Sequence, residues 1–286
     1  MRRLPSWVKK RLPEGEVYFK TRRLLRELHL FTVCEEARCP NVGECWGKGT
    51  ATFMIMGEIC TRKCRFCAVA HGNPSPLDPD EPYRVAEAAR RMGLSYVVIT
   101  SVTRDDLPDG GAKHFSKTIK AIRDTIPEAG IEVLIPDFGG KEENLRVILE
   151  SPPSVLNHNI ETVKELYKKI GRPQSFYSRS LKVLKFYSEH GLIVKSGMMV
   201  GLGESKEQIL VAMEDLLEAG VKILTIGQYL QPTKNNLSVE KYYLPDEFNE
   251  LKEIALAKGF SGVESGPLVR SSYKAEELYR EVSGLF

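Results

Sequence analysis

The stretch TFMIMGEICTRKCRFC, residues 52–67, joins an apolar run to three cysteines with the spacing CxxxCxxC. The apolar run, residues 52–59, is rich in β-forming side chains and predicts a buried strand. Cys60, Cys64 and Cys67 follow directly on that strand. In parallel α/β folds, ligands gather at the carboxyl ends of the strands. The stretch therefore predicts the first strand of a parallel sheet, with a thiolate site on the loop after it.

Five more apolar runs follow this strand, and amphipathic segments separate them. The six predicted strands cover residues 52–59, 95–100, 131–138, 154–161, 192–204 and 221–233. The predicted helices cover residues 83–93, 112–126, 141–151, 162–170 and 205–220. Ser205 signals the start of the last helix and Gly220 its end. Such a repeat indicates parallel strands joined by right-handed crossovers.

Six strand–helix units are too few for a closed eight-stranded barrel. We therefore expect an α/β fold, a partial, open (β/α)6 TIM-like barrel with N- and C-terminal extensions; a doubly wound sheet is the alternative. The barrel is expected at residues 51–235, between an N-terminal extension at 1–50 and a C-terminal extension at 236–286. Polar residues cluster where the strands end. Any one of them is better explained by a turn or a helix cap, and their collective placement is stronger evidence for a site than any single member. They are Ser101, Asp105, Asp106, Asp137, Asn157, Asn159, Glu161, Lys195, Ser196 and Gln228.

Charge is unevenly distributed along the 286 residues. Residues 1–28 hold nine Lys or Arg against three Glu, whereas the whole chain carries only +3. This basic arm is suited to an acidic partner, or it is a solvated surface segment. A net charge of +3 is too small to indicate a nucleic-acid partner. No stretch approaches the roughly 18 apolar residues of a membrane span, so we expect a cytoplasmic protein with reduced thiols.

The second triplet, Cys60, Cys64 and Cys67, can bind three irons of a cubane 4Fe–4S cluster. The fourth iron then has no protein ligand and can bind a substrate directly. The alternative is a zinc site completed by a distant histidine. The available histidines are His29, His71, His114, His158 and His190. CxxxCxxC is uncommon among zinc sites, so the cluster is favoured.

The first triplet, Cys34, Cys39 and Cys45, has the spacing CxxxxCxxxxxC and precedes the predicted barrel. Pro40 and Gly43 are expected to make turns that curl the three sulfurs around one centre. The pattern is less specific alone than together with the second triplet, which begins fifteen residues later.

The second triplet resembles the signature of the radical S-adenosylmethionine superfamily, CxxxCx(aromatic)C, in which Phe66 takes the aromatic position. The resemblance implies that S-adenosylmethionine binds the open iron of the cluster. Reductive cleavage then gives a 5′-deoxyadenosyl radical, which abstracts hydrogen from unactivated carbon. By the same resemblance, Phe66, Ser101, Asn159 and Lys195 are candidates for contact with S-adenosylmethionine.

Both triplets together, with RSSY at residues 270–273, resemble the lipoyl synthase family over almost the whole chain. This resemblance implies an auxiliary 4Fe–4S cluster held by the first triplet and by a serine. We expect Ser272 to be that ligand, with Ser271 as the alternative. An alkoxide is harder and more easily protonated than a thiolate, which suits an iron that must be released. Alternatively, the two serines cap the helix expected at 273–282.

Membership of that family implies the insertion of two sulfur atoms, at C6 and C8, into an octanoyl chain on a lysine of a lipoyl carrier protein. Two molecules of S-adenosylmethionine are consumed, and the auxiliary cluster gives its sulfur. Implied partners are an octanoylated carrier, such as glycine cleavage H protein or the E2 component of a 2-oxoacid dehydrogenase, and an electron donor such as flavodoxin or ferredoxin. We expect a monomer and assign no side chain as general acid or base. Rival functions are another radical enzyme, such as a biotin synthase or methylthiotransferase, and a zinc-stabilised nucleic-acid-binding module.

Overall fold

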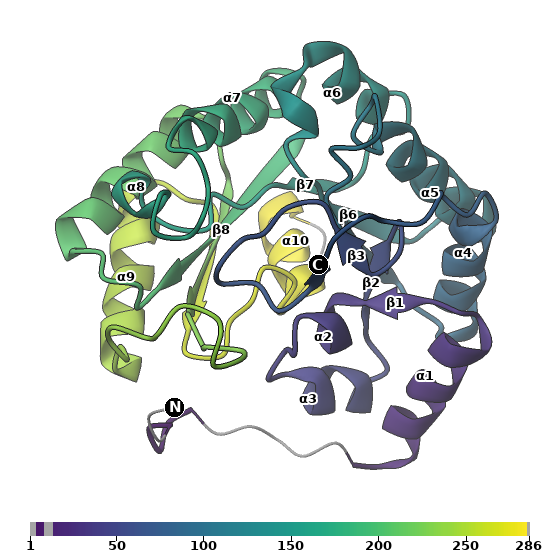
Figure 1. Cartoon of the computed structure of the whole chain (residues 1–286), viewed down its shortest axis with the longest axis horizontal. Helices are drawn as coiled ribbons and strands as arrows, with labels where there is room; N and C mark the ends of the chain where they lie inside the picture. Colours follow the sequence, from purple (N-terminus) through teal and green to yellow (C-terminus); the bar gives the residue numbers. More distant parts are fainter. Residues whose placement is uncertain (1–3, 9–13, 285–286) are drawn as a thin grey trace. The chain divides into compact units, whose positions relative to one another are not determined.

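The computed structural model describes residues 4–8 and 14–284, which form two compact units. The N-terminal unit comprises the described residues 14–63 and 68–154. The C-terminal unit comprises residues 4–8, 64–67 and 155–284. Figure 1 shows the elements of both units in chain order. The division expected at residues 50 and 235 stays a prediction.

The N-terminal unit contains a four-stranded sheet in the order β1-β2-β5-β6. The pairs β2–β5 and β5–β6 are parallel. The short β1 is antiparallel to β2, with Phe31 opposite Met54. A separate parallel pair, β3 and β4, lies outside this sheet. The bounds are β1 Phe31–Thr32, β2 Thr52–Ile55, β3 Ile59–Cys60, β4 Ala70–His71, β5 Tyr96–Ser101, β6 Gly130–Leu134, α1 Glu16–Glu27, α2 Val33–Glu36, α3 Val42–Gly47, α4 Glu81–Arg91, α5 Ala112–Thr125, α6 Glu142–Leu149 and the 3₁₀ turn η1 Phe138–Gly140.

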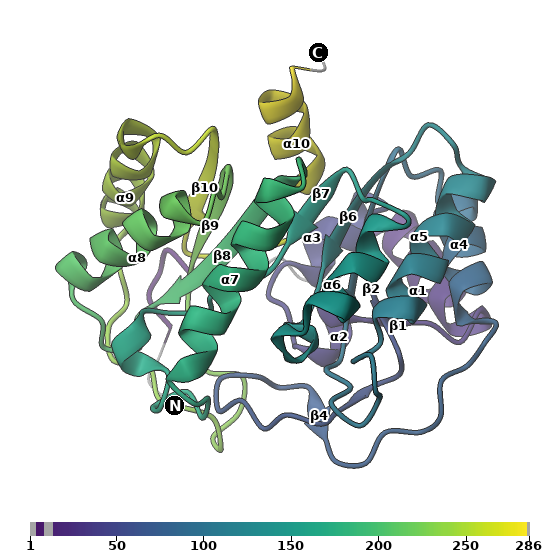
Figure 2. The same ribbon diagram turned by 90° about the horizontal axis from the view of Figure 1, so that it is seen from above.

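The C-terminal unit contains four parallel strands in the order β7-β8-β9-β10. Figure 2 shows α7, α8 and α9 beside these strands. Helix α10 packs against the beginning of β10, where Gly262 leaves room for Leu278 and Val282. The bounds are β7 Val155–Asn157, β8 Ile193–Val200, β9 Ile223–Gln228, β10 Gly262–Gly266, η2 Lys164–Leu166, α7 Ser175–Glu189, α8 Lys206–Glu218, α9 Pro245–Lys258 and α10 Ala275–Ser283.

The six predicted barrel strands are confirmed as β2, β5, β6, β7, β8 and β9; all but β5 are shorter than their apolar runs. Their side chains are buried on both faces, which explains why the runs are apolar throughout. Four of the predicted helices are confirmed as α4, α5, α6 and α8. Ser205 caps α8 through a capping box with Gln208, as its sequence indicates.

The helix predicted at residues 162–170 is wrong. Only the 3₁₀ turn η2 forms there, although Val163, Tyr167 and Ile170 are buried as the helical spacing suggests. Gly171, with a φ of +80°, and Pro173 end the segment before a regular helix can form. The real helix after β7 is α7, whose buried Tyr177, Ser180, Val183, Leu184 and Tyr187 follow helical spacing.

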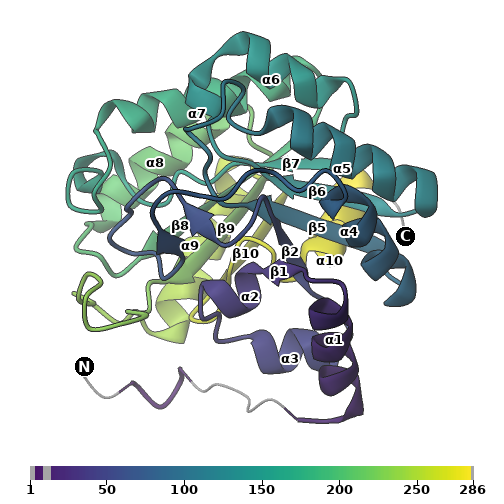
Figure 3. The same ribbon diagram turned by 45° about the vertical axis from the view of Figure 1, so that its right-hand side comes forward.

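Part of the basic arm is a packed helix, α1, whereas residues 1–3 and 9–13 lie outside the described part of the chain. Figure 3 shows α1 beside α2 and α3. The contact is made by Tyr18, whose ring centroid lies 5.3 Å from that of the buried Trp46 in α3. The arm from residue 16 onward is therefore part of the N-terminal unit and is not a loose surface segment.

Candidate functional site

Cys60 ends β3 and its sulfur receives two backbone hydrogen bonds. The N–H groups of Arg62 and Thr103 donate to Cys60 Sγ at 3.4 and 3.3 Å. Two N–H donors aimed at one sulfur are the kind of contact that sulfurs ligating an iron–sulfur cluster receive. Strand β2 leads to this loop through Met56 and Gly57, which have φ angles of +69° and +89°.

Cys64 contacts a partly buried arginine of the C-terminal unit. Arg172 Nε donates to Cys64 Sγ at 3.2 Å, and its Nη2 donates to Glu161 Oε1 at 3.2 Å. The guanidinium also lies over Phe66, 5.5 Å from the ring centroid. Burial raises the pKa of Glu161, and the Arg172 charge opposes this rise. Burial disfavours the Arg172 charge, but Glu161 and Cys64 outweigh it and raise the pKa of Arg172. A cation held at Cys64 fits an anionic cluster thiolate.

The segment 64–67 is clamped by the loop after β9. Asn236 Nδ2 donates to the carbonyl oxygens of Arg65 and Cys67, at 3.1 and 2.8 Å. The N–H of Leu237 donates to the same Arg65 carbonyl at 3.1 Å. Phe66 packs against a buried apolar cluster that includes Tyr229. Phe66 thus anchors the cysteine segment to the interior of the C-terminal unit.

The first triplet is gathered by α2, α3 and the turn between them. Cys34 lies in α2, Cys45 lies in α3, and the N–H of Cys39 donates to the Cys34 carbonyl at 3.0 Å. Pro40 lies in the turn as predicted, but the turn expected at Gly43 is wrong, because Gly43 is inside α3. Arg38, with a φ of +53°, reverses the chain instead.

Burial, and then the neighbouring thiols, disfavour ionisation of Cys34 and Cys45. The pKa of Cys34 is raised to about 11, first by burial and then by Cys39. The pKa of Cys45 is raised to about 12, first by burial and then by Cys34 and Cys39. Lys48 offsets part of the negative charge that a Cys45 thiolate would carry. Among the described residues no three Cys, His, Asp or Glu side chains are arranged to hold a single metal ion. Thiols are nevertheless the soft ligands of iron–sulfur clusters, whose irons would offset their charge.

The RSSY motif does not cap a helix. Helix α10 begins after Lys274, which has a φ of +50° and makes no side-chain cap, so the capping alternative for Ser271 and Ser272 is wrong. Ser271 donates instead to Asn159 Oδ1 at 2.9 Å. The side chain of Ser272 makes no hydrogen bond within the described part of the chain. A Cβ at Gly197 would lie 2.7, 2.8 and 2.9 Å from the side-chain oxygens of Thr225, Asn159 and Ser271, so these side chains would have to shift.

The four residues expected to contact S-adenosylmethionine are distributed over both units. Phe66, Asn159 and Lys195 belong to the C-terminal unit, where Lys195 is fully buried in β8. Ser101 ends β5 in the N-terminal unit, and its hydroxyl is buried with no hydrogen-bond partner among the described residues. Their contact with S-adenosylmethionine remains a proposal. In the described chain all six cysteines are free, and no helix is long and apolar enough to cross a membrane.

Comparison with known proteins defines the class. Residues 54–227 match the family model of the Radical SAM superfamily, and residues 1–39 match that of the N-terminal domain of lipoyl synthase of the Radical SAM family. The crystal structure of the [FeFe]-hydrogenase maturase HydG resembles this fold with a TM-score of 0.60 and 18% identity, covering 80% of this chain and 54% of that chain. The crystal structure of methylornithine synthase PylB resembles it with a TM-score of 0.55 and 16% identity, covering 86% of this chain and 73% of that chain. The chain thus has the α/β, partial TIM-like barrel fold of a radical S-adenosylmethionine enzyme, as expected.

Curated relatives narrow the class to one family. A lipoyl synthase of Rubrobacter xylanophilus is 56% identical over 96% of this chain and 85% of its own length. A lipoyl synthase of Geobacillus kaustophilus is 55% identical over 98% of this chain and 95% of its own. The chain belongs to the lipoyl synthase family. The resemblance inferred from the sequence is confirmed, and so is the expectation of an enzyme that uses S-adenosylmethionine and a 4Fe–4S cluster.

Three residues near the second triplet were not singled out from the sequence. Arg62 lies between its first two cysteines, Arg172 contacts Cys64, and Asn236 holds Cys67. An arginine inside the motif is a weak signal that could have pointed to Arg62. No local pattern marks Arg172 or Asn236, because each is more than 100 positions from its cysteine.

Proposed function

We propose that this chain inserts two sulfur atoms, at C6 and C8, into an octanoyl group attached to a lysine of a lipoyl carrier protein. Each insertion replaces a C–H bond with a C–S bond and consumes one molecule of S-adenosylmethionine. The observation that carries the proposal is identity above 50% to lipoyl synthases over nearly the whole chain, with both cysteine triplets present.

Cys60, Cys64 and Cys67 would hold the cluster that binds S-adenosylmethionine. When bound, this cluster supplies the electron that cleaves S-adenosylmethionine to a hydrogen-abstracting radical. The chain's own residues contribute hydrogen-bond donors to the sulfurs: backbone N–H groups at Cys60 and the Arg172 guanidinium at Cys64. Phe66, Ser101, Asn159 and Lys195 are proposed contacts of S-adenosylmethionine.

The sulfur source is proposed to be a second 4Fe–4S cluster, which is a substrate of the reaction. Cys34, Cys39 and Cys45 would bind three of its irons; the electrostatic effect of Cys39 on both Cys34 and Cys45 supports this. Ser272 is the proposed fourth ligand. Neither serine caps α10, so both hydroxyls are candidates. One finding supports Ser272 over Ser271: the Ser271 hydroxyl already bonds to Asn159.

The remaining partners follow from the same proposal. The carrier is an octanoylated protein or domain, such as glycine cleavage H protein or the E2 component of a 2-oxoacid dehydrogenase. A flavodoxin or ferredoxin would give the electrons. We propose that the enzyme acts as a monomer in the cytoplasm, where its six free thiols stay reduced.

The two triplets should fail in different ways when mutated. Cys64→Ala should abolish cleavage of S-adenosylmethionine, because the radical-generating cluster loses one of its three thiolates. Cys39→Ala should retain uncoupled cleavage but give no lipoyl product. The assay measures 5′-deoxyadenosine and lipoyllysine formed from an octanoylated peptide by anaerobically purified enzyme.

Iron content is the control for this experiment. Wild-type enzyme should hold about eight irons, and each variant about four. Equal loss of both activities in two folded variants would contradict the division between the triplets. Wild-type enzyme that cleaves S-adenosylmethionine but never makes lipoyllysine would contradict the proposed reaction.

A further inference from the structure

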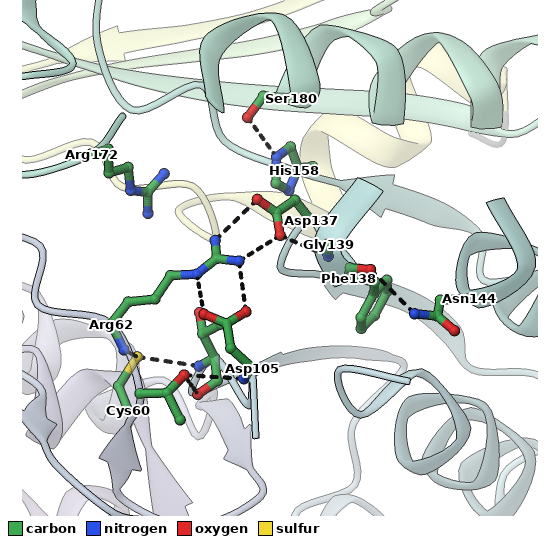
Figure 4. Close-up of polar contacts among 12 residues, drawn as sticks. Cys60, Arg62, Asp105, Asp137, Phe138, Gly139, Asn144, His158, Arg172 and Ser180 are labelled. Carbon is green, nitrogen blue, oxygen red and sulfur yellow. Dashed lines mark hydrogen bonds and ion pairs between the residues drawn. The ribbon is translucent and has the colours of Figure 1, made fainter. Parts of the chain in front are cut away.

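Arg62 lies between Cys60 and Cys64 in sequence, and its guanidinium is held by two aspartates (Figure 4). Its Nε and Nη2 donate to Asp105 at 2.8 Å each, and its Nη1 and Nη2 donate to Asp137 at 3.1 and 2.6 Å. Asp105 follows β5 and Asp137 follows β6. The arginine thus ties the beginning of the cysteine loop to the ends of two strands of the N-terminal unit.

This ion cluster is shielded from water on two of its three members. The side chains of Arg62 and Asp137 are 13% and 3% exposed, whereas that of Asp105 is 47% exposed. Asp137 Oδ1, which accepts from Arg62 Nη2, also accepts from the N–H of Gly139 at 3.0 Å. A planar guanidinium satisfies two carboxylates with four hydrogen bonds, which lysine cannot reproduce.

A second set of contacts joins the cysteine loop to the loop after β5, which carries Thr103 and Asp105. Thr61 donates through both its N–H and its hydroxyl to the Thr103 carbonyl, each at 3.0 Å. The Thr61 hydroxyl in turn accepts from the N–H of Asp105 at 3.1 Å. Thr103 and Arg62 are the residues whose N–H groups point at Cys60 Sγ. Arg62 and Thr61 therefore fix the two loops that carry both donors to this sulfur.

We propose that Arg62 is a positioning residue that sets the reduction potential of the cluster at Cys60, Cys64 and Cys67. It does so by holding the N–H groups of Arg62 and Thr103 on the Cys60 sulfur. Hydrogen bonds to cluster sulfurs stabilise the more negative, reduced state and raise the potential. The inference rests on the proposed function, because it requires a cluster at this triplet.

The test compares the holoenzyme with Arg62→Lys, Arg62→Gln and Lys63→Gln. Lysine keeps the positive charge but cannot make the four hydrogen bonds of the planar guanidinium. Glutamine loses both the charge and those hydrogen bonds. Lys63 is exposed on the same loop, so Lys63→Gln removes the same charge without touching the aspartates. Each protein is poised at a series of potentials, and its reduced clusters are followed by electron paramagnetic resonance. The signal that changes when S-adenosylmethionine is added identifies the relevant cluster.

Both Arg62 variants should show a lower midpoint potential for that cluster, by about threefold to tenfold in the reduction equilibrium constant, the size of one weakened charge-assisted hydrogen bond. The second cluster and Lys63→Gln should keep wild-type midpoints. A wild-type midpoint in Arg62→Lys would overturn the proposal, because charge alone would then suffice. So would an equal shift in Lys63→Gln.

Loss of iron from the Arg62 variants would move the test to Asp105→Asn. This variant weakens the two hydrogen bonds to Asp105 and leaves Arg62 paired with Asp137, so it should shift the midpoint in the same direction by a smaller amount. An unchanged midpoint there would refute the inference. Absence of any signal that responds to S-adenosylmethionine in wild-type enzyme would instead refute the proposed function.

Discussion

At the scale of single residues, the second cysteine triplet is held by side chains that lie far from it in the sequence. The cysteines could be predicted as cluster ligands because their spacing along the chain is itself the signal. Arg172 reaches Cys64 from 108 positions away, and only the fold brings them together. Glu161, which pairs with Arg172, has a φ of +68°, a conformation that non-glycine residues rarely adopt. The strain at Glu161 lies beside the arginine that contacts the cluster segment.

The two serines of the RSSY motif should behave differently. Ser272→Ala should lower the iron content by destabilising the auxiliary cluster and should reduce lipoyl product at least about tenfold, since one ligand is lost. Ser271→Ala removes the hydroxyl that donates to Asn159 and should keep about eight irons. Iron analysis and the lipoyllysine assay compare the two variants. Loss of the auxiliary cluster in Ser271→Ala alone would show that Ser271 is the ligand.

At the scale of elements, the apolar strand runs were decisive because parallel strands are buried on both faces. Helix starts with a capping box, as at Ser205, were equally readable. The segment 162–170 misled because tertiary packing buries its apolar residues without a regular helix. Strand β10 and helix α9 were missed because residues 236–286 were treated as an extension of the barrel. Sequence periodicity therefore predicted the repeating part of the fold better than its ends.

The contact between α7 and α8 can be tested at a glycine. Gly220 follows α8 with a φ of +78°, and an added Cβ would lie 2.0 Å from Ser188 Oγ and 2.7 Å from Ser188 Cβ. Gly191 has a similar φ of +81°, but its Cβ would meet nothing within 4 Å. Both alanine variants incur the left-handed backbone cost, and only Gly220→Ala also forces Ser188 aside.

Gly220→Ala should therefore lower the free energy of unfolding by about 1 to 3 kcal/mol more than Gly191→Ala does. Urea unfolding of the two variants, followed by circular dichroism, measures the difference. Equal losses in both would mean that α7 moves without cost, contrary to the close packing described.

At the scale of the whole molecule, the excess positive charge of residues 1–28 is exposed in part on helix α1. Arg23 and Arg26 are exposed on α1, whereas Arg22 is partly buried and its Nε has no partner in the described chain. Arg23 and Arg26 are therefore the side chains available to an acidic carrier. We propose that the octanoylated carrier is the acidic partner of the basic arm and that it contacts these two residues; Arg22 is better left unchanged in a test.

Arg23→Gln with Arg26→Gln should weaken binding of the octanoylated carrier by about threefold to tenfold at low salt, the size of two exposed charge pairs. The effect should shrink as salt rises, because exposed charges are screened. Lys117→Gln with Lys120→Gln removes the same charge from α5 and serves as the control. Unchanged affinity and salt dependence in the α1 variant would rule out this surface.

The clamp at Asn236 also affects when the cysteine segment can take its final form. Cys67 and Asn236 are 169 positions apart, so the segment emerges from the ribosome long before the residue that holds it. At usual rates of protein synthesis, that interval lasts roughly 10 to 30 s. Throughout this time, Cys67 lacks the Asn236 clamp. During the first part of it, Cys64 also lacks the Arg172 contact, because Arg172 has not yet been made. We therefore expect stable cluster insertion to be an event that follows translation of most of the chain, and not one that guides its early folding.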